Sequence, residues 1–461
     1  MSRAPSSFPY FTFINHACFT LRTDGALLLA DPWFEGSVLD GAWSLVDALT
    51  SSDRMIETLN ASSVPVYIWC SRAQPGWFAL PFLKRFRSEF RGIATFLYRP
   101  GRDLRLAGEL LHHKVSVAAC PDGVTVALAG GLRLTALANG DADTACLIGC
   151  GGRTILHLGE RALPSAAACQ AAAPRIARLA PRIDLLLSGF GSMGWCGNPE
   201  AGAERAAAAG AAVERLAAQV ECFRPSLVVP IASFARFARI DNAWLNGGRL
   251  APADLLAAPR LDGVRPLLRF LAPGAGIDLQ RDTPATLAPA HHLALAHWAA
   301  CWRLRPAPLP HPPPSSLGEL KTAFSRYRTR VAAGLHLLPR VLEAAGWLRP
   351  LWLHLPDLRL NVELSYQHGL RLLPRDTAAH VAMFSGTALQ LLRAEDGYDT
   401  VYAGGCFRTL RRSGLSAFGR FFLPQRMTRR GADRHRPLAM GSFLLRVLVS
   451  RLKRRPHGAS G

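Results

Sequence analysis

The chain has 461 residues, of which 49% are hydrophobic and 19% charged, and its formal net charge is +21. This composition is typical of a globular protein and excludes a disordered or fibrous chain. No uninterrupted run of about 18 apolar residues occurs, so the sequence predicts no membrane-spanning helix. Residues 1–12 lack a basic segment followed by an apolar one, so we expect no secretory signal peptide.

Short strands separated by turns dominate the first third of the sequence, and helices alternate with strands after them. The predicted strands are 11–14, 19–22, 26–30, 64–69, 124–128, 132–137, 144–148, 154–158 and 226–230. Helices are predicted at 80–90 and, in an alanine-rich segment, at 201–223. This order is typical of sheets covered by helices, which is an α/β sandwich.

A proline-rich segment, 305–314, is predicted to be a stiff connector between two domains. Beyond it we expect helices within 316–346, short strands within 351–373, a helix at 385–392 and a hairpin at 399–407. The predicted organisation is a first domain at 1–300, a linker at 301–318, a smaller α+β domain at 319–430 and a basic tail at 431–461.

The ten cysteines are scattered and form no CxxC motif, which argues against zinc ribbons and thioredoxin-like redox sites. In a chain without a signal peptide, this pattern favours reduced, mostly buried thiols in a cytoplasmic protein. Fifty of the 54 basic residues are arginine, which favours a bacterial source with high-GC coding.

Residues 10–260 contain a series of short motifs in this order: Ile14–Cys18, Leu28–Trp33, Gly41–Trp43, Ile183–Leu187, Gly194–Pro199, Pro230–Phe237, Asp241-Asn242 and Leu245-Asn246. In content and order they resemble the motifs of metallo-β-lactamase-fold hydrolases. The sequence resembles most closely the branch that includes the hydrolase-like part of CMP-sialic acid hydroxylase. The resemblance implies an αββα sandwich with a zinc or iron site at one edge of the paired sheets.

The family's ligand loop reads HxHxDH, and its metal makes a bound water nucleophilic near neutral pH. Aligned on Pro75, the ligand positions of that loop fall on Arg72, Gln74, Gly76 and Trp77, and the next expected histidine falls near Gly140. Arginine only donates hydrogen bonds, and glycine has no side chain. The sequence therefore predicts a degenerate site without bound metal, and a pseudoenzyme that is not a metallohydrolase.

Other polar residues are expected to gather at the same edge. Catalytic candidates are His16, Asp31, His157 and Glu160, the last standing where the family has a bridging aspartate; pocket candidates are Asp141, Asp143, Trp195, Asn198 and Ser233. We expect the guanidinium of Arg72 to replace the metal charge and to pair with Asp31 or Glu160, or else with a carboxylate or phosphate ligand. We therefore expect a non-catalytic binding or scaffold protein. The alternatives are a metal-dependent hydrolase with a site rebuilt from His16, His157, Asp141 or Glu160, and a membrane- or polyanion-associated accessory protein.

The second region resembles, in Val381–Leu389, Tyr398–Val401 and Gly404–Phe407, a sterol-carrier-type module, with a plain packing domain as the alternative. The segment from Val401 onward carries thirteen arginines and one lysine against one acid. Within it, 443–455 has the apolar spacing of a basic amphipathic helix, which either lies on an anionic membrane or packs on the protein itself. The expected partner is an unknown small molecule or protein. For the basic tail, the anionic inner membrane surface is favoured as a partner over nucleic acid.

Overall fold

The computed structural model describes residues 8–71, 80–101, 105–138, 144–160, 162–192 and 194–429. The chain divides into unit 1, Met1–Leu309, and unit 2, Pro310–Gly461. The division falls inside the proline-rich segment that the sequence marks as a connector. The basic tail at 431–461 lies outside the described residues. Among the helices of the described part, none is long and apolar enough to cross a membrane.

Two sheets form the centre of unit 1. The first has the order β16-β1-β2-β3-β6-β7-β8 and the second the order β14-β13-β12-β11-β10-β9. The strands of the first sheet are β1 Tyr10–Asn15, β2 Cys18–Arg22, β3 Leu27–Ala30, β6 Val66–Cys70, β7 Ala94–Tyr98, β8 Ser116–Ala119 and β16 Gly276–Asp278. Those of the second are β9 Thr125–Ala127, β10 Arg133–Leu137, β11 Ala145–Cys150, β12 Arg153–Gly159, β13 Leu185–Gly189 and β14 Leu227–Ile231.

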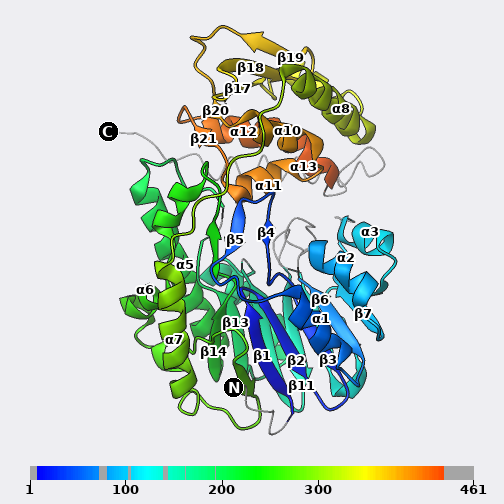
Figure 1. Cartoon of the computed structure of the whole chain (residues 1–461), viewed down its shortest axis with the longest axis vertical. Helices are drawn as coiled ribbons and strands as arrows, with labels where there is room; N and C mark the ends of the chain where they lie inside the picture. The colour runs from blue at the N-terminus through cyan, green and yellow to red at the C-terminus, as the bar shows by residue number, and fades with distance from the viewer. Residues whose placement is uncertain are drawn as a thin grey trace. The chain divides into compact units, whose positions relative to one another are not determined.

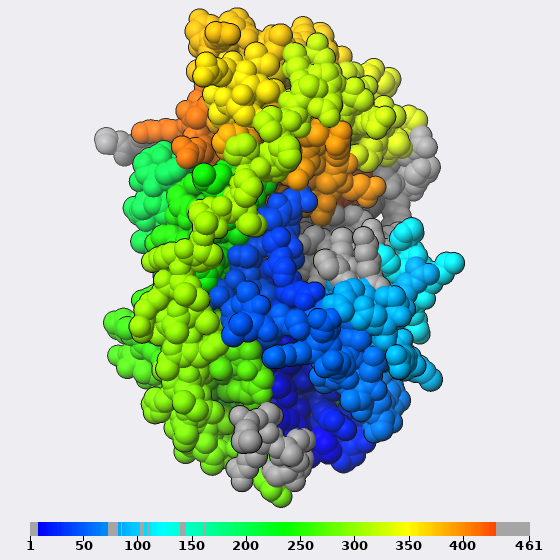
Figure 2. Space-filling view, in the orientation of Figure 1, coloured from blue at the N-terminus to red at the C-terminus, as the bar shows by residue number. Residues whose placement is uncertain are grey.

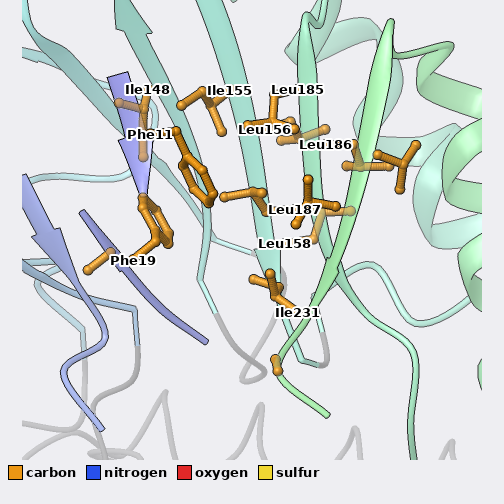
Figure 3. Close-up of a cluster of buried hydrophobic side chains, with 14 of the residues drawn as sticks. Phe11, Phe19, Ile148, Ile155, Leu156, Leu158, Leu185, Leu186, Leu187 and Ile231 are labelled. Carbon is orange, nitrogen blue, oxygen red and sulfur yellow. The ribbon is translucent and has the colours of Figure 1, made fainter. Parts of the chain in front are cut away.

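The main hydrophobic core lies between these sheets. Phe11 and Phe13 alternate with less buried residues along β1, as expected for a strand with one face in the core. Figure 3 shows Phe11 and Phe19 of the first sheet together with Leu156, Leu158 and Leu187 of the second, and all of them belong to one buried cluster. The cluster contains side chains from both sheets, and removing their apolar surface from water stabilises the face-to-face packing of the sheets.

Helices cover the outer faces of both sheets. On the first sheet, α1 Ser52–Asn60, α2 Leu80–Glu89 and α3 Arg105–His112 bury apolar residues in a second cluster with β3 and β6. On the other side of unit 1 lies α5 Gly202–Phe223 (Figure 1), which packs on α4 Ala166–Leu179 and on β13. Unit 1 therefore has the αββα layers expected from the sequence.

Two further elements matter for the site. A small sheet of order β15-β5-β4 is formed by β4 Ser37–Val38, β5 Trp43–Leu45 and β15 Ala235–Phe237. Near the end of unit 1, α6 Pro252–Ala257 is followed by α7 Ala288–Arg303, and the outer face of α7 is open to view in Figure 2.

His291 of α7 is a buried base, and it should make unit 1 sensitive to acid. Its Nδ1 accepts the backbone N–H of Phe270 at 2.9 Å, and burial, helped by the charges of Arg269 and His292, lowers its pKa from 6.5 to about 4. The unfolded chain therefore binds this proton at higher pH than the folded one, so stability is lost as the pH falls from about 6.5 towards about 4. We expect a loss of about 2 kcal/mol over this window, measured by urea unfolding at about pH 7 and about pH 4.5.

His291→Gln should remove this part of the pH dependence, because an amide oxygen can still accept the Phe270 N–H and does not titrate. His112→Gln is the control, since His112 is an exposed histidine on α3 and does not contribute to the lowered pKa of His291. Equal acid sensitivity of the wild type and His291→Gln would contradict the assignment.

Unit 2 is an α+β domain. Its sheet has the order β19-β18-β17-β20-β21. The strands are β17 Leu351–Leu355, β18 Leu360–Ser365, β19 Gly369–Leu373, β20 Val381–Ala382 and β21 Arg408–Thr409. The helices are α8 Leu317–Leu335, α9 Leu338–Ala344, α10 Ser385–Arg393, α11 Gly397–Gly404, α12 Gly414–Phe421 and α13 Leu423–Arg429. The hydroxyls of Tyr327 and Tyr366 lie 3.0 Å apart in its core, and Tyr366 donates to the carbonyl of Phe421.

The hairpin predicted at 399–407 is wrong, because Gly397–Gly404 forms helix α11. The glycines that suggested a turn instead end a helix. Gly405 has φ +68°, the left-handed conformation of a helix C-cap, and its N–H donates to the carbonyl of Val401.

Candidate functional site

Most of the candidate residues of unit 1 that the structure describes lie at the ends of strands from both sheets. Asp31 follows β3, Glu160 follows β12, Ser233 follows β14, and His16 forms the turn between β1 and β2. Three non-glycine residues at this edge, His16, Asp31 and Ala232, have φ values of 49°, 43° and 54°. Such left-handed residues are strained and often occur at functional sites.

Asp31 and His157 join the two sheets. Oδ1 of Asp31 accepts the backbone N–H of Ser71 at 2.8 Å. Its Oδ2 lies 3.6 Å from Nε2 of His157, whose side chain is completely buried. This separation is too long for a hydrogen bond but close for an electrostatic contact. Phe19 packs edge-on against the same imidazole at 5.3 Å.

His16 is fixed both through its backbone and through its ring. Its carbonyl accepts the N–H of Ala232 at 2.6 Å, which ties the β1–β2 turn to the end of β14. Its ring meets Trp33 edge-on at 4.7 Å. Because Trp33 donates its backbone N–H to the carbonyl of Asp31 at 2.7 Å, His16 and Asp31 belong to one connected arrangement.

Ser233 has a structural role. Its hydroxyl oxygen accepts the backbone N–H groups of Phe190 and Gly191 at 2.9 and 2.7 Å. A hydroxyl held in this way fixes the loop after β13 and is poorly placed to act as a nucleophile. The same loop is held from the other side by Arg215, which donates to the carbonyls of Gly189 and Gly191.

Arg249 brings a cation to this edge, and the sequence did not single it out. It donates to the carbonyl of Ser233, and its guanidinium lies over the ring of Trp43 at 5.1 Å. Burial lowers its pKa to about 10, whereas the negative charge of Glu160, itself 2% exposed, acts in the opposite direction. Arg249 therefore remains protonated at neutral pH, and its charge is felt by Glu160.

The Nη1 atom of Arg249 is buried and has no hydrogen-bond partner among the described residues. A buried donor without a partner is rare in proteins and marks a place where a bound oxygen atom would be favourable. No motif in the sequence points to this residue, because its relevance comes only from long-range contacts.

The remaining pocket candidates lie on the loop before α5. Asn198 donates to Glu200 at 3.0 Å, and its carbonyl accepts from Arg205, so it organises the start of that helix. Trp195 is half-buried. The pKa of the intervening Cys196 is raised by burial, against the charges of Arg205 and Arg249.

The structure thus brings together His16, Asp31, His157, Glu160 and Ser233 at one edge. The other predicted positions, Arg72, Gln74, Gly76, Trp77, Gly140, Asp141 and Asp143, lie outside the described residues. Among the described residues, three metal-ligating side chains converge at one point, formed by Asp47, His297 and Cys301. That point contains none of the candidates named from the sequence.

No protein-family model matches the sequence, and no curated protein matches it. Several solved structures are similar to part of the chain. Zn²⁺-bound PqqB from Methylobacterium extorquens is 14% identical, with a TM-score of 0.35 over 57% of this chain and 86% of that one. The metallo-β-lactamase fold protein YhfI from Bacillus subtilis is 10% identical, with a TM-score of 0.35 over 58% of this chain and 98% of that one. The short form of human tRNase Z is 13% identical, with a TM-score of 0.29 over 48% of this chain and 92% of that one. These values are too low to transfer a reaction or a ligand set.

Proposed function

We propose that unit 1 is a metallo-β-lactamase-fold protein of the branch resembling CMP-sialic acid hydroxylase, without the HxHxDH metal ligands, and that it binds an anion instead of catalysing metal-dependent hydrolysis. The observation that carries this proposal is the buried, unpartnered Nη1 of Arg249 beside Glu160. A carboxylate or phosphate oxygen would accept from it. The replacements at Arg72, Gln74, Gly76 and Trp77 agree with the proposal at the level of sequence.

The other described groups at the edge support a binding role. Ser233 is committed to two backbone N–H groups, and Asp31 accepts from Ser71. These contacts fix the strand ends, and among the described residues the guanidinium of Arg249 offers a buried cationic donor there, Nη1. A rigid frame around one cation suits recognition of a small anion, because little ordering entropy is lost on binding.

The experiment measures thermal stabilisation of the full chain by inorganic phosphate or succinate in an acetate-free, low-salt buffer. A specific site would stabilise the folded protein by about 2.7 kcal/mol when the anion reaches about 100 times its Kd. Arg249→Gln should abolish this stabilisation. Arg249→Lys keeps the charge but loses the fork of donors, and should retain only part of it.

Arg260→Gln is the matched control, because Arg260 is a surface arginine held by Glu214 and Glu221. Its anion response should equal that of the wild type. Circular dichroism checks that each variant is folded. An unchanged phosphate and succinate response in folded Arg249→Gln would overturn the assignment of Arg249.

Residence at the inner membrane surface through the basic tail stays a separate proposal. It rests on the spacing of apolar and basic residues at 443–455, a segment outside the described residues.

A further inference from the structure

Asp47, His297 and Cys301 form a cluster of metal-ligating side chains that contains none of the strand-end residues described above. Asp47 follows β5, while His297 and Cys301 lie one helical turn apart on α7. Nε2 of His297 is 2.8 Å from Oδ2 of Asp47 and 3.6 Å from Sγ of Cys301. The three ligand atoms all lie within 4.8 Å of one another.

We propose that Asp47, His297 and Cys301 bind one zinc-class divalent ion, with water as the fourth ligand. Carboxylate, imidazole and thiolate are the three side-chain donors that zinc takes in proteins. This inference is independent of the anion site proposed above.

The distances suit such an ion after a small adjustment. With Zn–S of about 2.3 Å and Zn–N of about 2.0 Å, tetrahedral ligands lie about 3.5 Å apart. The imidazole and thiol are already separated by 3.6 Å. The carboxylate and imidazole, now at hydrogen-bond distance of 2.8 Å, would have to move apart by about 0.6 Å. Side-chain rotation supplies a shift of this size.

Neighbouring groups hold the ligands in place. Oδ1 of Asp47 accepts the backbone N–H of Leu49 at 2.8 Å, which leaves Oδ2 for the ion. Asn15 donates to the backbone carbonyl of Asp47 at 2.8 Å and fixes that segment. The spacing of four residues puts His297 and Cys301 on the same face of α7. Outer contacts of this kind orient ligands in metal sites.

The cluster is accessible from one side. The side chain of Asp47 is 2% exposed and Cys301 is 9% exposed, but the side chain of His297 is 29% exposed. An ion could therefore enter beside the imidazole and keep a water molecule on that side.

The charges around the cluster are compatible with an ion. Burial and the charge of Asp47 raise the pKa of the Cys301 thiol, while Arg236 acts against them. Arg236 itself donates to the carbonyls of Val46 and Cys301. Its positive charge opposes a second cation, but a carboxylate and a thiolate together neutralise a divalent ion. Binding would release the thiol proton.

The same contacts could serve only as an ion pair that holds α7 against the segment after β5. Cobalt(II) separates the two interpretations, because a cobalt–thiolate bond gives an intense charge-transfer absorption that an ion pair does not. Titration of the full-length, chelator-treated protein should show this absorption saturating at about one equivalent, with zinc displacing the cobalt.

Cys301→Ser should abolish the absorption, and His297→Gln should lower the cobalt affinity more than about 100-fold, since changes to outer contacts alone cost about 10–100-fold. Cys222→Ser and His292→Gln are matched controls, on α5 and α7, and should behave like the wild type. Absence of the absorption in the folded wild type, or its persistence in Cys301→Ser, would overturn the proposal.

Elemental analysis distinguishes failure of this inference from failure of the proposed function. Zinc that disappears in folded Cys301→Ser is bound at the cluster and leaves the proposed function intact. Stoichiometric zinc that stays undiminished in folded Cys301→Ser would be bound elsewhere and would contradict this proposal, whereas the proposed function is tested separately by the anion response of Arg249→Gln.

Discussion

Asp241→Ala is expected to lower the free energy of unfolding of unit 1 by about 3 to 4 kcal/mol. Asp241 accepts two hydrogen bonds from the guanidinium of Arg239, at 2.9 and 2.6 Å, and the two side chains are only 6% and 2% exposed. Removing the carboxylate takes from a buried guanidinium the charge and the two hydrogen-bond acceptors of Asp241, and this costs far more than losing an exposed pair. Urea unfolding followed by tryptophan fluorescence measures the difference.

The double variant Arg239→Met/Asp241→Leu tests the cause. Since replacing both partners by apolar residues leaves no uncompensated charge, most of the lost stability should return. Asp262→Ala is the surface control, because Asp262 is 64% exposed in its pair with Arg265 and should change stability by less than about 1 kcal/mol. A double variant as unstable as Asp241→Ala would show that the cost arises elsewhere.

The asparagines of the recognised sequence motifs beside this ion pair hold loops in place through hydrogen bonds to the backbone. Asn242 accepts the N–H of Arg239 and donates to the carbonyl of Ala42, both at 2.9 Å. Asn246 exchanges hydrogen bonds with both the N–H and the carbonyl of Phe237. These motif residues thus fix the loops near the strand ends through side-chain-to-backbone hydrogen bonds. Because each such bond needs a particular side chain at a particular backbone position, these residues form a motif that can be recognised in the sequence.

The positions of the strand ends could be predicted from the sequence, but the side chains that carry the proposed chemistry could be predicted only in part. The sequence indicated Asp31 at the end of a buried apolar run, whereas Glu160 and Ser233 were indicated by the resemblance to the family's motifs. It could not indicate Arg249, whose contact with the Ser233 carbonyl depends on how an irregular segment folds back. The spacing of His297 and Cys301 was visible, but the sequence does not show that the distant Asp47 joins them.

Asp31→Ala is expected to lower the free energy of unfolding by about 3 kcal/mol. The Asp31 carboxylate accepts the Ser71 N–H at 2.8 Å and faces the fully buried His157 at 3.6 Å, so its loss leaves buried polar groups on both sheets without this partner. Asp31 also has φ +43°, a conformation that alanine adopts at a cost of about 1 kcal/mol but that asparagine tolerates. Chemical unfolding of the full chain near neutral pH measures the loss.

Asp31→Asn separates these contributions. Its amide oxygen can still accept from Ser71, and its backbone tolerates the left-handed conformation, so only the charge opposite His157 is lost. We therefore expect a smaller loss of stability, about 1 kcal/mol. If the two side chains are coupled, the same Asp31→Asn change should cost much less when it is made in the His157→Gln variant than in the wild type. Asp53→Asn is the control, since Asp53 is 66% exposed in its contact with Arg85 and should be nearly neutral. Equal losses in Asp31→Ala and Asp31→Asn would mean that charge alone, and neither the Ser71 hydrogen bond nor the backbone conformation, makes Asp31 important at this edge.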